Sequence, residues 1–224
     1  MELLEHTLYI NLEHRKDRML HASKQFEMLG ISGERFNAVK TKSGAVGCTI
    51  SHIKCLELAM QREYEQVFIC EDDILFTDTK SFKNSITQFR DSGIEWDVLF
   101  VSGNNGPPFQ PVSEFCVRTY NCQCGTGYIV KKHYYSTLLT NMRKGLSNLM
   151  REPTNKPMYA LDVYWKQLQA TDKWYLITPL TVVQAACYSD IEEKNVDYKS
   201  LMLDLEKPWL QQRYDEHIRK MNNK

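Results

Sequence analysis

The sequence has no excess of charge of either sign, because 28 Lys and Arg residues balance 28 Asp and Glu residues. A broad nucleic-acid-binding face needs surplus basic side chains to replace the counterions of the phosphates. We therefore expect no nucleic acid among the partners, although this balance allows one anionic ligand held by a few local cations. The chain also has no run of about 18 apolar residues, so no transmembrane segment is expected.

The N-terminal residues lack the basic region and apolar stretch of a secretory signal peptide. A disulfide framework is not expected either, because the seven cysteines are odd in number and scattered, several of them in apolar runs. This usage is typical of reduced thiols. Cys122 and Cys124 form the only close pair, without the second pair that a zinc finger needs. We expect a cytoplasmic protein.

No linker rich in Pro, Gly or Ser divides the 224 residues, and the composition does not shift along the chain. The hydrophobic content of 42% and the charged content of 25% are typical of a globular protein. A chain of this size buries roughly 70% of its unfolded surface. We predict a single domain over residues 1–224.

Strand and helix patterns alternate in the first half of the chain. Apolar runs predict strands at residues 7–12, 35–40, 67–70 and 98–101. Helical spacing predicts a helix that ends at Gly30, a second that begins near Gly44 and a third at 80–91. The unbroken apolar run 67–70 is typical of a strand covered on both faces. This alternation favours an α/β sheet with right-handed crossovers.

The second half has a different pattern. Residues 104–108 predict a loop, and strands at 115–120 and 126–130 favour an antiparallel pair. Helices are predicted at 134–143 and 159–169, and a late strand near 174–183. Beyond Lys199 we expect a helical tail that Pro208 interrupts.

Glu71, Asp72 and Asp73 are three consecutive carboxylates directly after the apolar run 67–70. Ligands of open α/β sheets collect at the carboxyl ends of strands. Adjacent carboxylates raise one another's pKa unless a cation neutralises them, and oxygen ligands suit Mg²⁺ or Mn²⁺. A solvated turn is the alternative interpretation, but apolar residues on both sides of the triplet favour a site.

Two further segments open helices with side chains suited to an anion. Arg15 and Arg18 share one helical face near a helix N-terminus, where guanidinium groups can bind phosphate. Pairing with nearby acids on a solvated face is the alternative. Ser51 and His52 lie in the first turns of the helix near Gly44, where the positive helix end favours a neutral imidazole.

Together these segments resemble glycosyltransferase family 25, which includes lipooligosaccharide sugar transferases and collagen galactosyltransferase domains. The resemblance covers roughly residues 7–191, and the order of its motifs makes it specific. In place of a strict Asp-x-Asp, this sequence has Glu71-x-Asp73, as many members of the family do. The family often has an acidic residue beside the glycine segment, where this sequence has Ala45 and Val46. The motifs are YINLEHRKDR (9–18), RFNAV (35–39), GAVGCTISH (44–52), FICEDDI (68–74), GTGYIV (125–130), Asp162, PLTVVQ (179–184) and SDI (189–191).

The resemblance implies a nucleotide-sugar-binding α/β fold of the GT-A type, with a central, mostly parallel twisted sheet. It implies a nucleotide-binding half to about residue 103, an acceptor-side half at about 104–198 and the tail at about 199–224. The implied reaction is inverting transfer of a hexose from a UDP-sugar, with Mn²⁺ (or Mg²⁺). The acceptor would be a glycan, a lipid-linked saccharide or hydroxylysine, as in lipopolysaccharide biosynthesis or collagen glycosylation.

Carried over residue by residue, the resemblance assigns the metal to Asp73, with Glu71 and Gln184 beside it. Asp162, at the start of a predicted helix, is the candidate catalytic base, and helix capping is its alternative role. The remaining positions would bind the nucleotide sugar: Asn11, Leu12, Arg15, Arg18, Ser51, His52, Glu71 and Asp72.

Two other functions stay open at this point. A catalytically inactive protein of the same fold would bind nucleotide or glycan without turnover. A metal-dependent nucleotidyltransferase or phosphohydrolase would use similar carboxylates but release pyrophosphate or phosphate.

Overall fold

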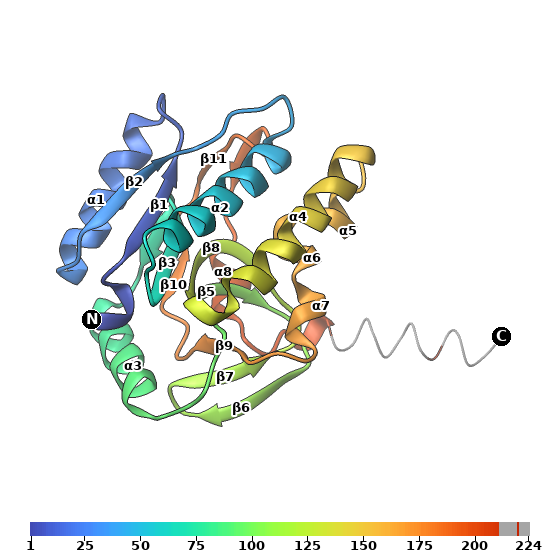
Figure 1. Ribbon diagram of the computed structural model, residues 1–224. Helices are drawn as coiled ribbons and strands as arrows, with labels where there is room; N and C mark the ends of the chain where they lie inside the picture. The colour runs from blue at the N-terminus through green and yellow to red at the C-terminus, as the bar shows by residue number, and fades with distance from the viewer. Residues whose placement is uncertain (211–218, 220–224) are drawn as a thin grey trace.

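A central sheet of eight strands organises the computed structural model, which describes residues 1–210 and 219. Helices lie on both sides of this sheet (Figure 1). The strand order is β2-β1-β3-β8-β5-β9-β7-β6. The strands are β1 (Thr7–Asn11), β2 (Gly33–Asn37), β3 (Gln66–Glu71), β5 (Val98–Asn105), β6 (Phe109–Ser113), β7 (Cys116–Thr119), β8 (Cys122–Lys131) and β9 (Trp174–Ile177).

The sheet is mixed, and it is mostly parallel in the sense that six of its eight strands run in the same direction, as the resemblance implied. β1 runs parallel to β2 and β3, and β5 runs parallel to β9. β8 is antiparallel to both β3 and β5, and β7 is antiparallel to β9 and β6. The carboxyl ends of β1 and β3 therefore meet at one edge of the sheet, where ligands of such folds collect.

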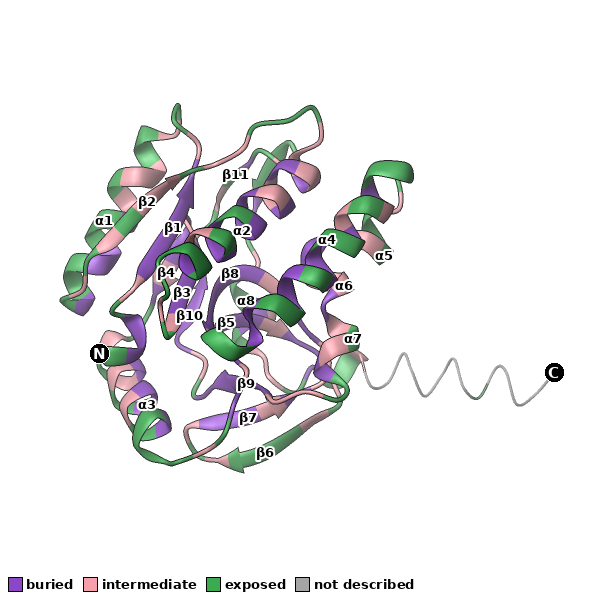
Figure 2. Ribbon diagram, in the orientation of Figure 1, coloured by how far each residue is buried: buried purple, intermediate pink, exposed green. Residues whose placement is uncertain are grey.

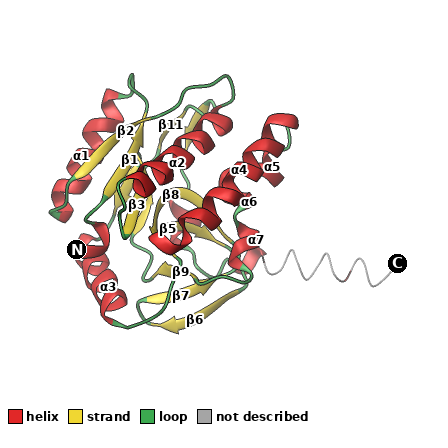
Figure 3. Ribbon diagram, viewed as in Figure 1, coloured by secondary structure: helices red, strands yellow, loops and turns green. Residues whose placement is uncertain are grey.

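Four long helices and several short ones surround the sheet (Figure 3). In the described part of the chain, none of the helices has the length and apolar character needed to cross a membrane. The helices are α1 (Lys16–Leu29), α2 (Gly44–Gln61), α3 (Thr79–Asp91), α4 (Tyr135–Arg151), α5 (Lys156–Tyr159), α6 (Leu161–Tyr164), α7 (Lys166–Gln169) and α8 (Lys199–Leu203), with 3-10 turns at Glu2–Leu4 and Lys132–Tyr134.

The two faces of the sheet carry separate apolar cores. Figure 2 shows that much of the central strands is buried. In β3, Val67 and Ile69 pack with residues of α2 and α4, whereas Phe68 and Cys70 pack with residues of α1 and α3. Successive side chains of a strand point to opposite faces. The unbroken apolar run of β3 is therefore the consequence of cover on both sides.

Most elements of the first half lie where the sequence predicted them. α1 ends at Gly30, whose φ of 70° is left-handed and whose amide donates to the carbonyls of Phe26 and Glu27. Glycine adopts this conformation without the steric cost of a Cβ. The predicted strand at 35–40 is shifted, since β2 is Gly33–Asn37.

Four predictions for the second half were wrong. The strands predicted at 115–120 and 126–130 are β7 and β8, but they do not pair with each other, because β7 lies between β9 and β6 and β8 lies between β3 and β5. The helix predicted at 159–169 is the broken series α5, α6 and α7, because Ala160 has an extended ψ of 146° that stops helical propagation. The strand predicted at 174–183 is two strands, β9 in the main sheet and β10 (Val182–Gln184) in a separate pair with β4 (Ile74–Phe76). Residues 104–108 are not all loop, because β5 continues to Asn105.

In the described part of the C-terminal tail, helical residues lie on both sides of a break at 204–207, so the interruption comes before Pro208. α8 ends at Leu203, and helical residues resume at Pro208, a position where proline fits the first turn of a helix. The tail predicted at about 199–224 otherwise falls on residues 211–218 and 220–224, outside the described residues. A last small pair, β11 (Cys187–Ser189) with β12 (Lys194–Val196), precedes α8.

Candidate active site

The acidic triplet lies where the chain leaves the main sheet. Glu71 is the last residue of β3, Asp72 and Asp73 form the turn, and Ile74 opens β4. β4 pairs with β10 so that Ile74 lies opposite Gln184. The Ala185 amide donates to the Asp73 carbonyl at 2.8 Å. The turn is therefore fixed on both sides, by the sheet and by the β4–β10 pair.

Two adjoining cavities meet at Glu71. The larger cavity, of about 520 Å³, lies between β1, the start of α1, the loop before α2 and the triplet. The smaller cavity, of about 320 Å³, lies between α2, β8 and the start of α6. Glu71, Cys48 and Gln184 line both cavities. This geometry places two ligand-sized spaces side by side with a carboxylate between them.

Asp72 is buried and both of its oxygens are engaged. Its Oδ2 accepts a hydrogen bond from Asn11 Nδ2 at 2.7 Å, and its Oδ1 accepts one from Arg18 Nη1 at 2.9 Å. Asn11 is in turn oriented by Arg35, whose Nε donates to Asn11 Oδ1 at 2.8 Å. Asn11, Arg18 and Asp72 thus form a network that joins β1, α1 and the turn.

Asp73 is only 2% exposed. Its Oδ2 accepts a hydrogen bond from Gln184 Nε2 at 2.8 Å and lies 3.1 Å from Arg18 Nη1, while its Oδ1 has no hydrogen-bond partner. Burial, reinforced by the charge of Glu71, raises the pKa of Asp73 to about 7. The structure thus brings together Asp73, Glu71 and Gln184, and leaves one Asp73 oxygen unsatisfied.

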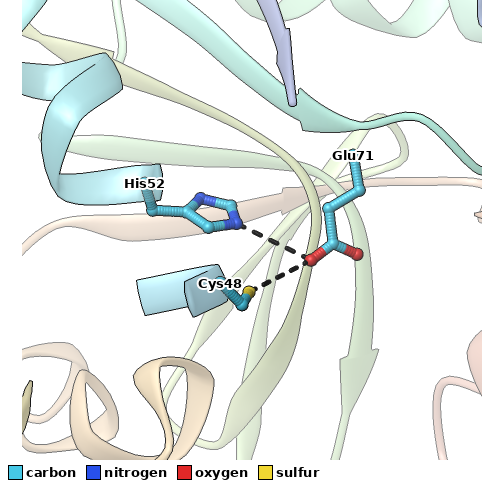
Figure 4. A group of neighbouring side chains, drawn as sticks. All are labelled: Cys48, His52 and Glu71. Carbon is cyan, nitrogen blue, oxygen red and sulfur yellow. Dashed lines mark hydrogen bonds and ion pairs between the residues drawn. The ribbon is translucent and has the colours of Figure 1, made fainter. Parts of the chain in front are cut away.

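Glu71 points toward Cys48 and His52 of α2 (Figure 4). Its Oε1 lies 3.6 Å from His52 Nε2 and 3.7 Å from Cys48 Sγ. Burial raises the pKa of Glu71, but His52 and then Arg18 oppose it, so the pKa lies below its ordinary value. His52 is fully buried, and its Nδ1 lies 2.9 Å from the Tyr128 hydroxyl.

The remaining donor-side residues also lie around the larger cavity. Leu12, Arg15, Arg18 and Ser51 line it, and Asn11 reaches it only through the network with Asp72. Arg15 Nη1 donates to Asp190 Oδ2 at 2.6 Å. The Ser51 hydroxyl accepts from the Val39 amide and donates to the Gly47 carbonyl, both at 2.8 Å. Ser51 therefore holds the loop before α2 in place.

Asp162 lies in the first turn of α6 and lines the smaller cavity. Its Oδ2 accepts a hydrogen bond from the Cys124 backbone amide at 3.0 Å. Cys124 has a φ of 92°, which is uncommon for a residue with a side chain. Burial raises the pKa of Asp162. The structure places Asp162 and the triplet around adjoining spaces, with Glu71 common to both.

Sequence reasoning missed three residues of this region. Cys48 precedes His52 by one helical turn, and this i, i+4 spacing was the available signal. Asp190 was noted only within a motif, and its contact with Arg15 depends on long-range folding. Lys156 lines both cavities, and nothing in its sequence neighbourhood predicts this.

The oxygen donors of the larger cavity fit a divalent cation of the Mn²⁺ or Mg²⁺ type. Such ions prefer carboxylate and carbonyl oxygens, which Asp73, Glu71 and Gln184 supply. The unpartnered Oδ1 of buried Asp73 supports this fit, because buried polar atoms are usually hydrogen-bonded. Arg18 neutralises Asp73 from the other side, so the site does not depend on a cation for charge balance.

The architecture has a counterpart among solved structures. The structure resembles the crystal structure described as a glycosyltransferase involved in the glycosylation of the major capsid of PBCV-1, with a TM-score of 0.52 and 11% sequence identity. The likeness covers 84% of this chain and 94% of that chain. The fold is therefore the GT-A-like α/β fold of glycosyltransferases, as the resemblance implied.

The sequence comparisons show a likeness to one family of glycosyltransferases. Residues 42–146 match the model of glycosyltransferase family 25, described as an LPS biosynthesis protein. A glycosyltransferase 25 family member of Anopheles gambiae is 25% identical over 193 residues, which is 72% of this chain and 31% of that protein. One of Drosophila pseudoobscura pseudoobscura is 28% identical over 127 residues, 43% of this chain and 20% of that protein.

The chain is therefore similar to glycosyltransferase family 25 over residues 42–146. The match of 42–146 contains α2 and the acidic triplet, and the order of motifs around it agrees with the resemblance from the sequence. The chain spans about a third of the length of one of these two relatives and about a fifth of the other.

Proposed function

We propose that this chain is a metal-dependent inverting glycosyltransferase that moves a hexose from a UDP-sugar to a hydroxyl group of a glycan or protein. The observation that carries the proposal is the pair of cavities that meet at Glu71, with Asp73 in the larger and Asp162 in the smaller. An inverting transfer needs a leaving group on one side of the sugar carbon and a base on the other. The two cavities can supply these two sides.

The larger cavity is the donor side in this proposal. Arg15, Lys40 and Lys42 line it, and cationic side chains of this kind bind a diphosphate. Mn²⁺ (or Mg²⁺) would be held by Asp73 with Glu71 and Gln184, and it would neutralise the charge that develops on the diphosphate. Ser51 and the Asn11–Asp72–Arg18 network keep the walls of this cavity in position.

The smaller cavity is the acceptor side. Asp162 takes the proton from the acceptor hydroxyl, and the Cys124 amide holds one carboxyl oxygen so that the other faces the substrate. Because burial raises the pKa of Asp162, its carboxylate is a stronger base than an exposed aspartate. The acceptor belongs to the class of glycans, lipid-linked saccharides or hydroxylysine side chains.

The test is release of UDP from a panel of UDP-sugars, with and without Mn²⁺, by wild type, Asp73→Asn and Asp162→Asn. Asp91→Asn is the matched control, because Asp91 is exposed and far in sequence from the triplet. We expect UDP release by wild type to need Mn²⁺. Turnover should fall strongly in Asp73→Asn and in Asp162→Asn but not in Asp91→Asn. Full turnover in folded Asp73→Asn would contradict the role of this carboxylate.

One observation favours a second candidate function. Arg18 already neutralises Asp72 and Asp73, as expected of a protein that binds nucleotide or glycan without turnover. Such a protein would show a rise in melting temperature with UDP but no UDP release from any UDP-sugar. The same panel separates the two functions.

A further inference from the structure

A second group of metal-ligating side chains lies beside the oxygen donors already described. Cys48 and His52 are one turn apart on α2, and Glu71 ends β3 opposite them. One ligand atom from each, namely the Cys48 sulfur, a His52 ring nitrogen and a Glu71 oxygen, lies within 4.8 Å of the other two. Figure 4 shows all three side chains directed toward one point.

The distances match those around a tetrahedral ion. Zinc binds sulfur at about 2.3 Å and nitrogen or carboxylate oxygen at about 2.0–2.1 Å. At tetrahedral angles these bond lengths separate the ligand atoms by about 3.3–3.6 Å. The Glu71 oxygen lies 3.6 Å from His52 Nε2 and 3.7 Å from Cys48 Sγ. The third pair of ligand atoms, from Cys48 and His52, lies within 4.8 Å.

An independent observation at His52 also points to a ligand. The residue is fully buried, yet its Nε2 has no hydrogen-bond partner. Its other nitrogen lies 2.9 Å from the Tyr128 hydroxyl, and an outer partner of this kind orients a metal-ligating histidine. A ring fixed at Nδ1, with a free Nε2 facing a thiol and a carboxylate, is a pre-oriented donor.

We propose that Cys48, His52 and Glu71 form a site for a thiolate-preferring ion of the Zn²⁺ class, which shares Glu71 with the diphosphate-side metal site at Asp73 but has different other donors. Thiolate and imidazole ligands select Zn²⁺ over Mn²⁺ and Mg²⁺. On binding, the ion replaces the thiol proton of Cys48, and this proton passes to solvent. The fourth position is open to the cavities, because Cys48 and Glu71 line both of them.

The site also has a consequence for transfer, which rests on the proposed function. An ion bound here lies at the junction of the two cavities and holds Glu71 away from Asp73. Zn²⁺ therefore inhibits transfer even when Mn²⁺ is saturating. The chain would then contain an activating site for one class of ion and an inhibitory site for another.

The test measures binding first, without turnover. Co²⁺ is added to the reduced protein, and a thiolate-to-cobalt absorption band is expected in wild type and absent in Cys48→Ser and Cys48→Ala. Zn²⁺ affinity is measured by competition and should fall at least about tenfold in Cys48→Ser and Glu71→Gln. Cys124→Ser is the matched control, since it alters another thiol of the smaller cavity and should keep the band.

Each outcome decides the proposal. An absent cobalt band in wild type, or unchanged Zn²⁺ affinity in folded Cys48→Ser, overturns the site. In the transfer assay with saturating Mn²⁺, we expect Zn²⁺ to inhibit wild type and to have little effect on Cys48→Ser. A protein that binds Zn²⁺ through Cys48 but releases no UDP would contradict the proposed function and leave the metal site standing.

Discussion

Replacing Arg18 by Met should destabilise the protein strongly, because two buried carboxylates would lose their counterion. Arg18 Nη1 lies 2.9 Å from Asp72 and 3.1 Å from Asp73, and the three side chains are 14%, 7% and 3% exposed. At an effective dielectric constant of 20, each pair at this separation has a gross attraction of about 5 kcal/mol. Desolvation offsets much of it, and removing one partner of a buried pair costs about 3–5 kcal/mol.

The assay is urea unfolding at about pH 8.5, above the pKa of about 7 of Asp73, so that both carboxylates are ionised. Arg18→Met should lower the free energy of unfolding by that amount, and with it the midpoint, without a change in slope. The double variant Arg18→Met/Asp73→Asn should lose about 1–3 kcal/mol less free energy of unfolding than the sum of the two single losses, because the two side chains are in contact. Arg143→Met is the control. It breaks a pair with Glu57 that is 57% and 43% exposed and should cost at most about 1 kcal/mol. A loss below about 1 kcal/mol for Arg18→Met, or strict additivity, would refute the reasoning.

The other predictions concern the two cavities. Asp162→Asn should lower kcat by about 10²–10⁴-fold while UDP still raises the melting temperature; an undiminished kcat would exclude Asp162 as the base. In wild type, kcat/KM should fall as the pH drops through a pKa above the ordinary 3.8, because burial raises the pKa of Asp162 and the base must be ionised; the pH profile of Asp162→Asn should lack this limb. Gly125→Ala should weaken Zn²⁺ binding in the competition assay, because the new Cβ would lie 3.2 Å from His52 Nε2 and 3.4 Å from a Glu71 oxygen; an unchanged affinity would show that the cluster tolerates this methyl group.

Periodicity predicted the first half of the fold well. The alternation of apolar runs and helical stripes gave β1, α1, α2, β3, α3 and β5 nearly in place, because each buries a face with its own repeat. The α/β class followed from this alternation, whereas the GT-A type was implied by the family resemblance, and the comparison with a solved structure confirmed it. The division into halves at about residue 103 stays a prediction.

Short elements and long-range contacts were beyond this kind of reasoning. β4 and β10 have three residues each, too few for a period, yet their pairing places Gln184 beside Asp73. The contact of Arg18 with Asp72 joins residues far apart in sequence. From the sequence alone, each of the two side chains could equally have paired with a charged residue close to it in the chain. The grouping of Asp73, Glu71 and Gln184 was predicted from a family resemblance, whereas the partnership of Cys48 with Glu71 needed coordinates.

The strand order of the main sheet also determines the shortest fragment of this protein that keeps its central strands paired. The segment that matches the family model, residues 42–146, contains neither β1, which lies between β2 and β3, nor β9, which lies between β5 and β7. Cut out alone, it would leave β3 and β5 with bare edges and strip away Arg18, Asp162 and Gln184. Fragments for biochemistry should therefore run from before Thr7 to beyond Val196.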